Sequence, residues 1–263
     1  MARILVFDSG VGGLTIAGEI AELMPEAELS YLADNGFFPY GTKPEADLVE
    51  RIARVVGLAV AHIGPDCVVI ACNTASTVAL PRLRSEIACP VVGVVPAVKP
   101  AAALSRNRVI GLLGTPGTVR RLYTEELIER FATDCTVLRV GSVELVEAAE
   151  RLFEGDAVPA GTVERVLAPF LDRPAAAQPD TIVLACTHFP LLRAELAAAS
   201  PPGITFVDSG RAVAERVRTL MGDPQQGDGG RHLYVTRDDA ALRRRLPAFA
   251  ARGYGRVSFL TMG

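Results

Sequence analysis

The 263-residue sequence lacks several features that identify common classes of protein. It has no tryptophan and little imbalance of charge, because 27 basic residues stand against 30 acidic residues, for a formal net charge of −3. That balance argues against a nucleic-acid-binding surface as the main function. The longest apolar runs are interrupted by glycine, proline or polar residues, so none is long enough to span a bilayer. We therefore expect no membrane contact.

Cysteines are few and are not spaced in close pairs. The chain has five, an odd count, and none shows the spacing of a zinc site. Nothing resembling a signal peptide precedes the first predicted strand, so we expect thiols that stay reduced in a cytoplasm. A P-loop is absent, and the glycines between residues 10 and 13 do not follow the dinucleotide pattern. The motifs therefore favour neither a metal nor a nucleotide cofactor.

What the chain does contain is a regular alternation of predicted strands and helices. Hydrophobic residues make up 49% and charged residues 22%, which suits a sizeable core. Near-continuous apolar strands between amphipathic helices predict parallel sheets covered on both faces. A polar, glycine-rich stretch at 223–230 is expected to form a mobile loop. The predicted strands are 3–7, 29–33, 67–71, 91–95, 109–113, 136–140, 181–185, 204–207 and 233–236, and the predicted helices are 14–24, 47–63, 77–86, 119–131, 144–153, 162–171 and 239–251.

Two cysteines occupy matching places in this pattern. Cys72 and Cys186 each follow a short apolar run and an alanine, and each precedes small hydrogen-bonding residues and an apolar stretch that resembles a helix. They lie about one small domain's length apart. Ligands of parallel sheets bind beyond the carboxyl ends of the strands. The duplication therefore predicts two thiols that face one cleft from opposite sides, as inversion of a stereocentre by proton transfer requires.

The residues around these thiols suit that chemistry. A helix that begins just after a thiol lowers its pKa and favours the thiolate, and the backbone N–H groups of Asn73, Thr74 and Thr187 could bind a carboxylate. His188 could tune the Cys186 thiol, because imidazole titrates near neutral pH. The alternative is that both cysteines are small buried hydrophobic residues. That alternative suits the remaining three, Cys67, Cys89 and Cys135.

Other polar residues also follow predicted strands. Asp8 and Ser9 could cap a helix, but the adjoining glycines allow a ligand to approach the backbone, so we favour a functional role for Asp8. Asp208-Ser209-Gly210 repeats the tripeptide, and there we expect only a cap. For Thr115 and Thr118 a turn is as good an explanation as a site.

The aromatic loop around Tyr40 and the arginines of the last predicted helix differ in what they predict. Tyr40 could donate a hydrogen bond to a distal carboxylate of a ligand, whereas Phe37 and Phe38 are expected to pack. Arg243, Arg244 and Arg245 are expected to lie on the solvated face of an amphipathic helix.

Taken in order, six motifs resemble the aspartate/glutamate racemase superfamily, and within it the glutamate racemases. The likeness covers nearly the whole chain. The motifs are Val6-Phe7-Asp8-Ser9-Gly10-Val11-Gly12-Gly13-Leu14, Pro39-Tyr40-Gly41, Ala71-Cys72-Asn73-Thr74-Ala75, Val92-Gly93-Val94-Val95-Pro96, Gly114-Thr115-Pro116-Gly117-Thr118 and Cys186-Thr187-His188-Phe189-Pro190-Leu191-Leu192.

This resemblance implies a fold and a reaction. The fold is α/β, with two pseudo-symmetric flavodoxin-like domains, mostly parallel sheets and the active site between them. The first domain would comprise residues 1–96 and 208–263, and the second residues 97–207. The implied reaction is a cofactor-independent and metal-independent isomerisation of L-glutamate to D-glutamate, which supplies peptidoglycan synthesis.

Site residues follow from the resemblance as well. Cys72 and Cys186 would be the two bases, with Asp8 supporting the first and His188 the second. A glutamate on a helix of the second domain would complete the catalytic group, and Glu150 is the better match, with Glu147 as the alternative. Substrate would contact Asp8, Ser9, Pro39, Tyr40, Gly41, Cys72, Asn73, Thr74, Thr115, Thr118, Cys186, Thr187 and His188.

The resemblance also suggests partners. The segment around Glu150 resembles a subgroup that the cell-wall precursor UDP-N-acetylmuramoyl-L-alanine activates, some family members bind DNA gyrase, and a homodimer is expected. Three other functions stay open at this point. They are racemisation of aspartate, a non-catalytic binding module, and a single-cysteine hydrolase with His188 as base, which would leave Cys72 without a role.

Overall fold

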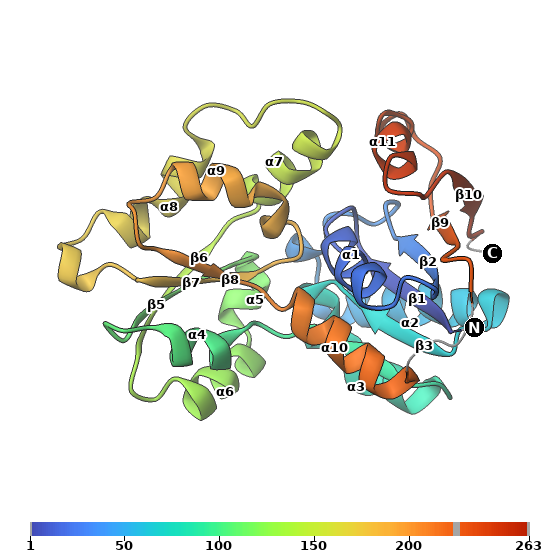
Figure 1. Ribbon diagram of the computed structural model, residues 1–263, viewed down its shortest axis with the longest axis horizontal. Helices are drawn as coiled ribbons and strands as arrows, with labels where there is room; N and C mark the ends of the chain where they lie inside the picture. Colours follow the sequence, from blue (N-terminus) through green and yellow to red (C-terminus); the bar gives the residue numbers. More distant parts are fainter. Residues whose placement is uncertain (1, 223–226, 262–263) are drawn as a thin grey trace.

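In the computed structural model, which describes residues 2–222 and 227–261, ten strands form two separate parallel sheets. The first has six strands in the order β10-β9-β2-β1-β3-β4, and the second has four in the order β6-β5-β7-β8. Every neighbouring pair is parallel, as predicted. Figure 1 shows the two sheets side by side, each with its own helices.

The first sheet is built mainly from the N-terminal third of the chain and its C-terminal end. Alternate residues of β1 face opposite sides, so that Ile4 and Val6 pack under α1, α10 and α11, while Leu5 and Phe7 pack under α2 and α3. The strands are β1 (Arg3–Asp8), β2 (Glu28–Ala33), β3 (Cys67–Ile70), β4 (Val91–Gly93), β9 (Arg231–Val235) and β10 (Arg256–Phe259), and the helices are α1 (Leu14–Leu23), α2 (Glu45–Ile63), α3 (Asn73–Glu86), α10 (Gly210–Met221) and α11 (Ala240–Ala250), with a 3₁₀ turn η1 (Tyr40–Thr42).

The second sheet repeats this plan with the intervening residues. Leu113 and Leu184 pack under α7 and α8, whereas Leu112 and Val183 pack under α4 on the other face. Its strands are β5 (Val109–Gly114), β6 (Thr136–Gly141), β7 (Thr181–Ala185) and β8 (Thr205–Val207), and its helices are α4 (Val98–Leu104), α5 (Pro116–Arg120), α6 (Leu122–Phe131), α7 (Glu144–Phe153), α8 (Thr162–Leu171) and α9 (Arg193–Ala198), with 3₁₀ turns η2 (Ala175–Ala177) and η3 (Phe189–Leu192).

The predicted domain division passes between these two groups of elements. Every strand of the first sheet lies within 1–96 or 208–263, and every strand of the second lies within 97–207. The boundaries themselves stay a prediction. We call the two groups the first lobe and the second lobe below.

Several details differ from the sequence-based expectations. The helix predicted after Thr118 is two helices, because Arg121 adopts extended backbone angles between α5 and α6. The apolar stretch after Cys186 is a 3₁₀ turn followed by the short helix α9. At the repeated tripeptide Asp208-Ser209-Gly210, the Ser209 side chain does not cap α10 but donates to the carbonyl of Val95 over 2.5 Å.

Two other expectations concern the surface and the membrane. The loop predicted as mobile at 223–230 falls partly outside the described residues. In the part of the chain that the structure describes, no helix is both long and apolar enough to cross a membrane.

Candidate active site

One small cavity lies where the carboxyl ends of strands from both sheets meet. Its volume is about 20 Å³, room for a single water molecule. Ser9 and Cys72 reach it from the first sheet, and Thr115 and Cys186 reach it from the second. The predicted residues that line it are Ser9, Pro39, Tyr40, Gly41, Cys72, Asn73, Thr74, Thr115, Cys186, Thr187 and His188, and they are joined by Phe38, Thr42, Val143 and Val146.

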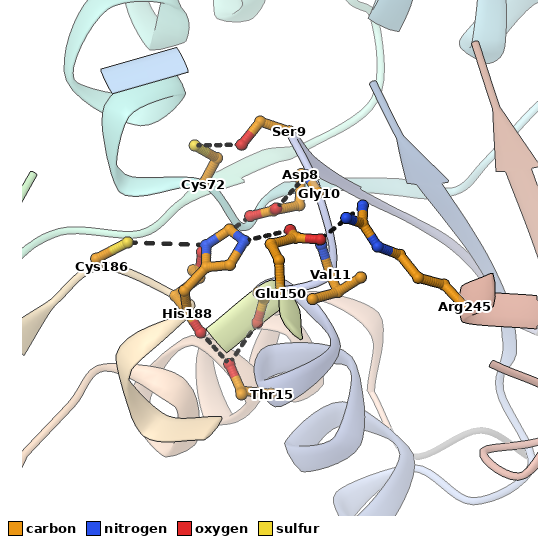
Figure 2. A network of polar contacts seen from close by, with 12 residues as sticks. Asp8, Ser9, Gly10, Val11, Thr15, Cys72, Glu150, Cys186, His188 and Arg245 are labelled. Carbon is orange, nitrogen blue, oxygen red and sulfur yellow. Dashed lines mark hydrogen bonds and ion pairs between the residues drawn. The ribbon is translucent and has the colours of Figure 1, made fainter. Parts of the chain in front are cut away.

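Both predicted cysteines contribute their thiols to this cavity. Cys72 lies just beyond the end of β3, after Ala71, and is the N-cap residue of α3, and Cys186 directly follows β7. Each is 6% exposed. Ser9 Oγ lies 3.8 Å from Cys72 Sγ, and His188 Nδ1 lies 3.8 Å from Cys186 Sγ (Figure 2). Each thiol therefore has one polar neighbour of its own.

The pKa of Cys72 differs from the sequence-based expectation. A helix does begin at Asn73, and the backbone N–H of Ala75 in its first turn donates a hydrogen bond to the thiol, which by itself lowers the pKa. Burial and the nearby Asp8 carboxylate nevertheless raise the pKa of Cys72 to about 12. The expected lowering by the helix is therefore wrong for this thiol, because desolvation outweighs it. Cys72 holds its proton at neutral pH.

The second thiol has a charged support. His188 Nε2 lies 2.7 Å from Glu150 Oε1, and both side chains are almost completely buried. Burial disfavours the imidazolium, yet contacts with Cys186 and Glu150 raise the pKa of His188 well above its ordinary value. Burial likewise opposes ionisation of Glu150, but the hydrogen bond and charge of His188 and the charge of Arg245 lower its pKa overall. The pair is thus an imidazolium and a carboxylate beside Cys186.

Of the two glutamates proposed from the sequence, Glu150 is the one that reaches this group. It lies on α7 and is 3% exposed, and its Oε1 also accepts the backbone N–H of Val11 over 3.0 Å. Glu147 lies one turn earlier and is exposed. Asp8, Thr118 and Glu150 are all buried but lie behind the residues that line the cavity.

Asp8, which lies behind the residues that line the cavity, connects the two lobes. Its Oδ1 accepts the backbone N–H of Gly10 over 2.7 Å, and its Oδ2 accepts the hydroxyl of Thr187 over 2.9 Å. Complete burial raises the pKa of Asp8, although His188 opposes this. Asp8 therefore acts on the site through Thr187 and through its charge.

Glycines after β1 allow the lobes to approach this closely. A Cβ atom on Gly10 would collide with Glu150 Oε1, and one on Gly12 would lie 2.5 Å from His188 Nδ1. Because Gly10 and Gly12 have no side chain, the carboxylate and the imidazole of the second lobe can occupy that space. The glycine motif thus serves a close contact between lobes.

A line of threonines joins the lobes on another side of the cavity. Thr74 Oγ1 lies 3.2 Å from Thr115 Oγ1, which lies 3.0 Å from Thr118 Oγ1. Thr115 also caps α5, since its hydroxyl accepts the backbone N–H of Thr118 over 3.2 Å. Thr115 therefore both caps a helix and lines the cavity, whereas Thr118 lies behind it; a role of either residue in substrate binding stays a prediction.

Tyr40 lines the cavity, but its hydroxyl has a partner within the protein. It donates to Asp34 Oδ2 over 2.6 Å, and Arg51 makes a two-point contact with the same carboxylate. Burial and the Asp34 charge raise the pKa of Tyr40 well above its ordinary value. Sequence reasoning missed Asp34, although it directly follows β2 and so satisfies the strand-end rule used for Asp8.

Phe38 was also missed as a site residue. The sequence predicts that Phe38 packs, and its ring does lie 5.9 Å from the His188 ring, but it also lines the cavity. Asn73 lines the same cavity, and its buried Oδ1 atom accepts no hydrogen bond from the described residues. An acceptor of this kind suits an ammonium group. Two thiols, an acceptor and a helix N-terminus at one cavity can hold an amino acid and move a proton at its α-carbon.

Known proteins resemble this chain along most of its length. The family model described as Asp/Glu/hydantoin racemase matches residues 15–217. The glutamate racemase of Sodalis glossinidius is 46% identical over 98% of this chain and 91% of its own length, and that of Pectobacterium carotovorum is 52% identical over 83% of this chain and 76% of its own. The solved structure of Escherichia coli glutamate racemase in complex with L-glutamate and activator UDP-MurNAc-Ala is 43% identical, with a TM-score of 0.94 over 99% of this chain and 98% of that one.

Proposed function

The chain belongs to the Asp/Glu/hydantoin racemase family as one of its glutamate racemases, and we propose that Cys72 and Cys186 are the two bases of its reaction. Glutamate racemases interconvert the L and D enantiomers of glutamate and supply D-glutamate for peptidoglycan. The observation that carries the proposal is that both thiols, one from each sheet, line a single cavity.

The protonation states suggest how a turnover begins. Cys72 holds its proton because its pKa is about 12, and Cys186 lies against the His188 imidazolium. In this state Cys186 removes the α-proton of one enantiomer as a thiolate, and the Cys72 thiol returns a proton to the opposite face. The other direction starts with the thiolate on Cys72, and the α-ammonium group of bound substrate supplies a positive charge that favours it.

The remaining residues hold the substrate. The N-terminus of α3, with the backbone N–H groups of Asn73 and Thr74, suits the α-carboxylate and stabilises negative charge as the α-carbon loses its proton. The free Oδ1 atom of Asn73 suits the α-ammonium group. Ser9 and Thr187 line the same cavity, and so do Pro39, Tyr40 and Gly41, of which Gly41 lies close to Thr115. Since the Tyr40 hydroxyl donates to Asp34, we assign Tyr40 a shaping role rather than a hydrogen bond to substrate.

Glutamate is much larger than a cavity of about 20 Å³. Substrate entry therefore requires the lobes to separate, and closure around the substrate excludes water from the reacting carbon.

The test of this mechanism uses proton exchange and optical activity together. Purified protein is incubated with L-glutamate or D-glutamate in D₂O without added cofactor or metal, while proton NMR follows the α-proton and circular dichroism follows the enantiomer. Wild type should exchange and racemise, and Cys72→Ala and Cys186→Ala should each abolish racemisation. Near wild-type racemisation by either variant in both directions would refute the two-base assignment. Aspartate as competitor measures the strictness for glutamate.

Partners and location extend the proposal. The E. coli relative binds UDP-MurNAc-Ala as an activator, so we propose that this precursor also stimulates the present enzyme, which a rate measurement with and without it tests. From the family resemblance we further propose a homodimer and binding to DNA gyrase, to be tested by light scattering and by a pull-down with purified gyrase. We place the enzyme in the cytoplasm, because all five cysteines are free and two of them must stay reduced to act.

A further inference from the structure

Arg245 does not lie on a solvated face, contrary to the sequence-based expectation. Its side chain is 13% exposed and reaches from α11 of the first lobe to Glu150 and Glu154 of the second. Nη1 lies 2.7 Å from Glu150 Oε2, and Nε donates to Glu154 Oε1 over 2.8 Å. Figure 2 shows its guanidinium on the side of Glu150 away from the thiols. Arg245 is therefore the outer member of a chain that continues through Glu150 and His188 to Cys186.

We propose that Arg245 is a positioning residue for the Cys186 half of the racemase reaction, acting through Glu150 and His188. The inference rests on the proposed function, because it assumes that Cys186 exchanges a proton with substrate. It adds a residue from the C-terminal helix of the first lobe to a catalytic group carried by the second.

The contacts of Glu150 show why a cation is needed there. One oxygen, Oε1, has two donors, the imidazole of His188 and the backbone N–H of Val11. The other, Oε2, is buried and receives no aligned hydrogen bond from any described residue. The charge of Arg245 at 2.7 Å is what compensates that oxygen. A buried carboxylate without such compensation is costly and tends to take up a proton.

Other charges around Glu150 make the compensation more important. The Asp8 carboxylate at the end of β1 and the Tyr31 phenol of β2 both interact electrostatically with Glu150. Glu154, the residue that directly follows α7, faces the same guanidinium. His188 is the cation on the cavity side. If Arg245 lost its charge, the cluster would become more negative and each of its protons would be harder to remove.

The packing of α7 on α11 does not depend on Arg245 alone. Phe153 of α7 and Phe249 of α11 meet edge to face with ring centroids 5.1 Å apart, and Arg252 lies over the Phe153 ring at 4.7 Å. A variant at position 245 should therefore keep the two helices together. A change in the kinetics of such a variant can then be attributed to the missing charge rather than to a loss of packing.

The helix also offers a matched control in the neighbouring residue. Arg244 Nε donates to Glu154 Oε2 over 2.7 Å, and its side chain is 60% exposed. Its ion pair is with Glu154, whereas Arg245 also pairs with Glu150. Arg244→Gln removes an arginine, a positive charge and a contact with α7. It leaves the compensation of Glu150 in place.

The experiment compares wild type, Arg245→Gln, Arg245→Lys and Arg244→Gln. We measure kcat and KM in both directions by circular dichroism across the pH range, with melting temperatures as a check on folding. The equilibrium constant between enantiomers is one, so kcat/KM must agree between directions and the informative quantities are kcat and the pH profile. Arg245→Gln should lower kcat roughly tenfold or more, a part of the about 10²–10⁴ that general acid–base catalysis contributes, while KM changes by less than about threefold.

The pH profile provides the readout that a purely structural role would not move. In Arg245→Gln the acid limb of kcat/KM should move to higher pH, Arg245→Lys should restore it because the charge returns, and Arg244→Gln should match wild type. The inference is overturned if Arg245→Gln and Arg244→Gln give superimposable profiles. It is also overturned if Arg245→Lys fails to restore activity and the melting temperature falls in parallel. Failure of wild type to racemise glutamate would instead refute the proposed function.

Discussion

Thr187 donates its hydroxyl to Asp8 Oδ2 over 2.9 Å, although Asp8 ends β1 of the first sheet and Thr187 follows β7 of the second. The same Asp8 carboxylate contributes to raising the pKa of Cys72, and Thr187 directly follows Cys186. One buried carboxylate thus connects the surroundings of both thiols. Such a link gives each lobe an effect on the chemistry of the other.

Asp8→Asn tests the electrostatic part of this link. Burial is the first cause of the raised pKa of Cys72 and the Asp8 charge is the second, so removing that charge should lower the pKa from about 12. Alkylation of Cys72 by iodoacetamide, followed by mass spectrometry of its peptide, should become several-fold faster at about pH 9. Asp208→Asn is the control, because Asp208 Oδ1 accepts the N–H of Gly210 over 2.8 Å just as Asp8 accepts that of Gly10. Unchanged alkylation in Asp8→Asn would contradict the prediction.

The glycines after β1 allow a second test. Gly12→Ala would place a Cβ atom 2.5 Å from His188 Nδ1, so the lobes could not close to the observed distance. We expect kcat to fall by about 10² or more, since a displacement of about 1 Å at a reacting group has effects of that size. Gly57→Ala is the control, because it lies within α2 with nothing within 4 Å of the new atom. It should keep wild-type kcat and gain about 0.5–1 kcal/mol in the free energy of unfolding, measured in urea. Equal kcat values for the two variants would show that the close approach is unnecessary.

Glu150→Gln and Glu147→Gln distinguish the two glutamates of α7. The first replaces the carboxylate that contacts His188 at 2.7 Å, and the second alters an exposed residue one turn away. Glu150→Gln should lower the pKa of His188, since contact with Glu150 helps to raise it, and should reduce kcat roughly 10²-fold. Steady-state kinetics and NMR titration of the His188 ring measure the two effects. Loss of activity in Glu147→Gln instead would reverse the assignment.

Much of the fold was predictable because its signals are local. Helices α7 and α8 and strand β7 have the predicted bounds, since their apolar periodicity runs uninterrupted between turn residues. Helices α4 and α10 and strand β10 were missed. In α10 only Gly210, Val213, Ala214 and Val217 are buried, and β10 is a short edge strand with partly exposed residues, so neither carries a strong pattern.

The site residues that come just after a predicted strand could be identified from the sequence. Cys72 and Cys186 both come just after a predicted strand, and they line the same cavity. Arg245 could not be found in this way, because it lies within a helix among arginines and its neighbour Arg244 is 60% exposed. Only the packing of α7 on α11 decides which arginine reaches Glu150. The pKa of Cys72 was mispredicted for a related reason, since a helix N-terminus is visible in a sequence but the degree of burial is not.

Stability at alkaline pH provides a test that is independent of catalysis. Burial is the main cause that raises the pKa of Cys67 from 9.0 to about 12. Between about pH 9 and about pH 12 the folded state therefore keeps a proton that the unfolded chain releases, and the free energy of unfolding falls as pH rises. Each such thiol contributes at most about 1.4 kcal/mol per pH unit to that slope, and Cys72 behaves in the same way.

Cys67→Ala should make this decline less steep. The variant removes one of the two buried thiols whose pKa is raised to about 12 and leaves Cys72 in place, at a cost of about 1 kcal/mol at neutral pH for the smaller buried side chain. Urea unfolding under reducing conditions, repeated at several values between about pH 8 and about pH 11, gives the slope. Cys135→Ala is the control, because Cys135 is only partly buried; burial raises the pKa of its thiol as well, so the variant should change the slope in the same direction but by less. Parallel curves for wild type and Cys67→Ala would mean that Cys67 loses its proton as readily in the folded protein as in the unfolded chain.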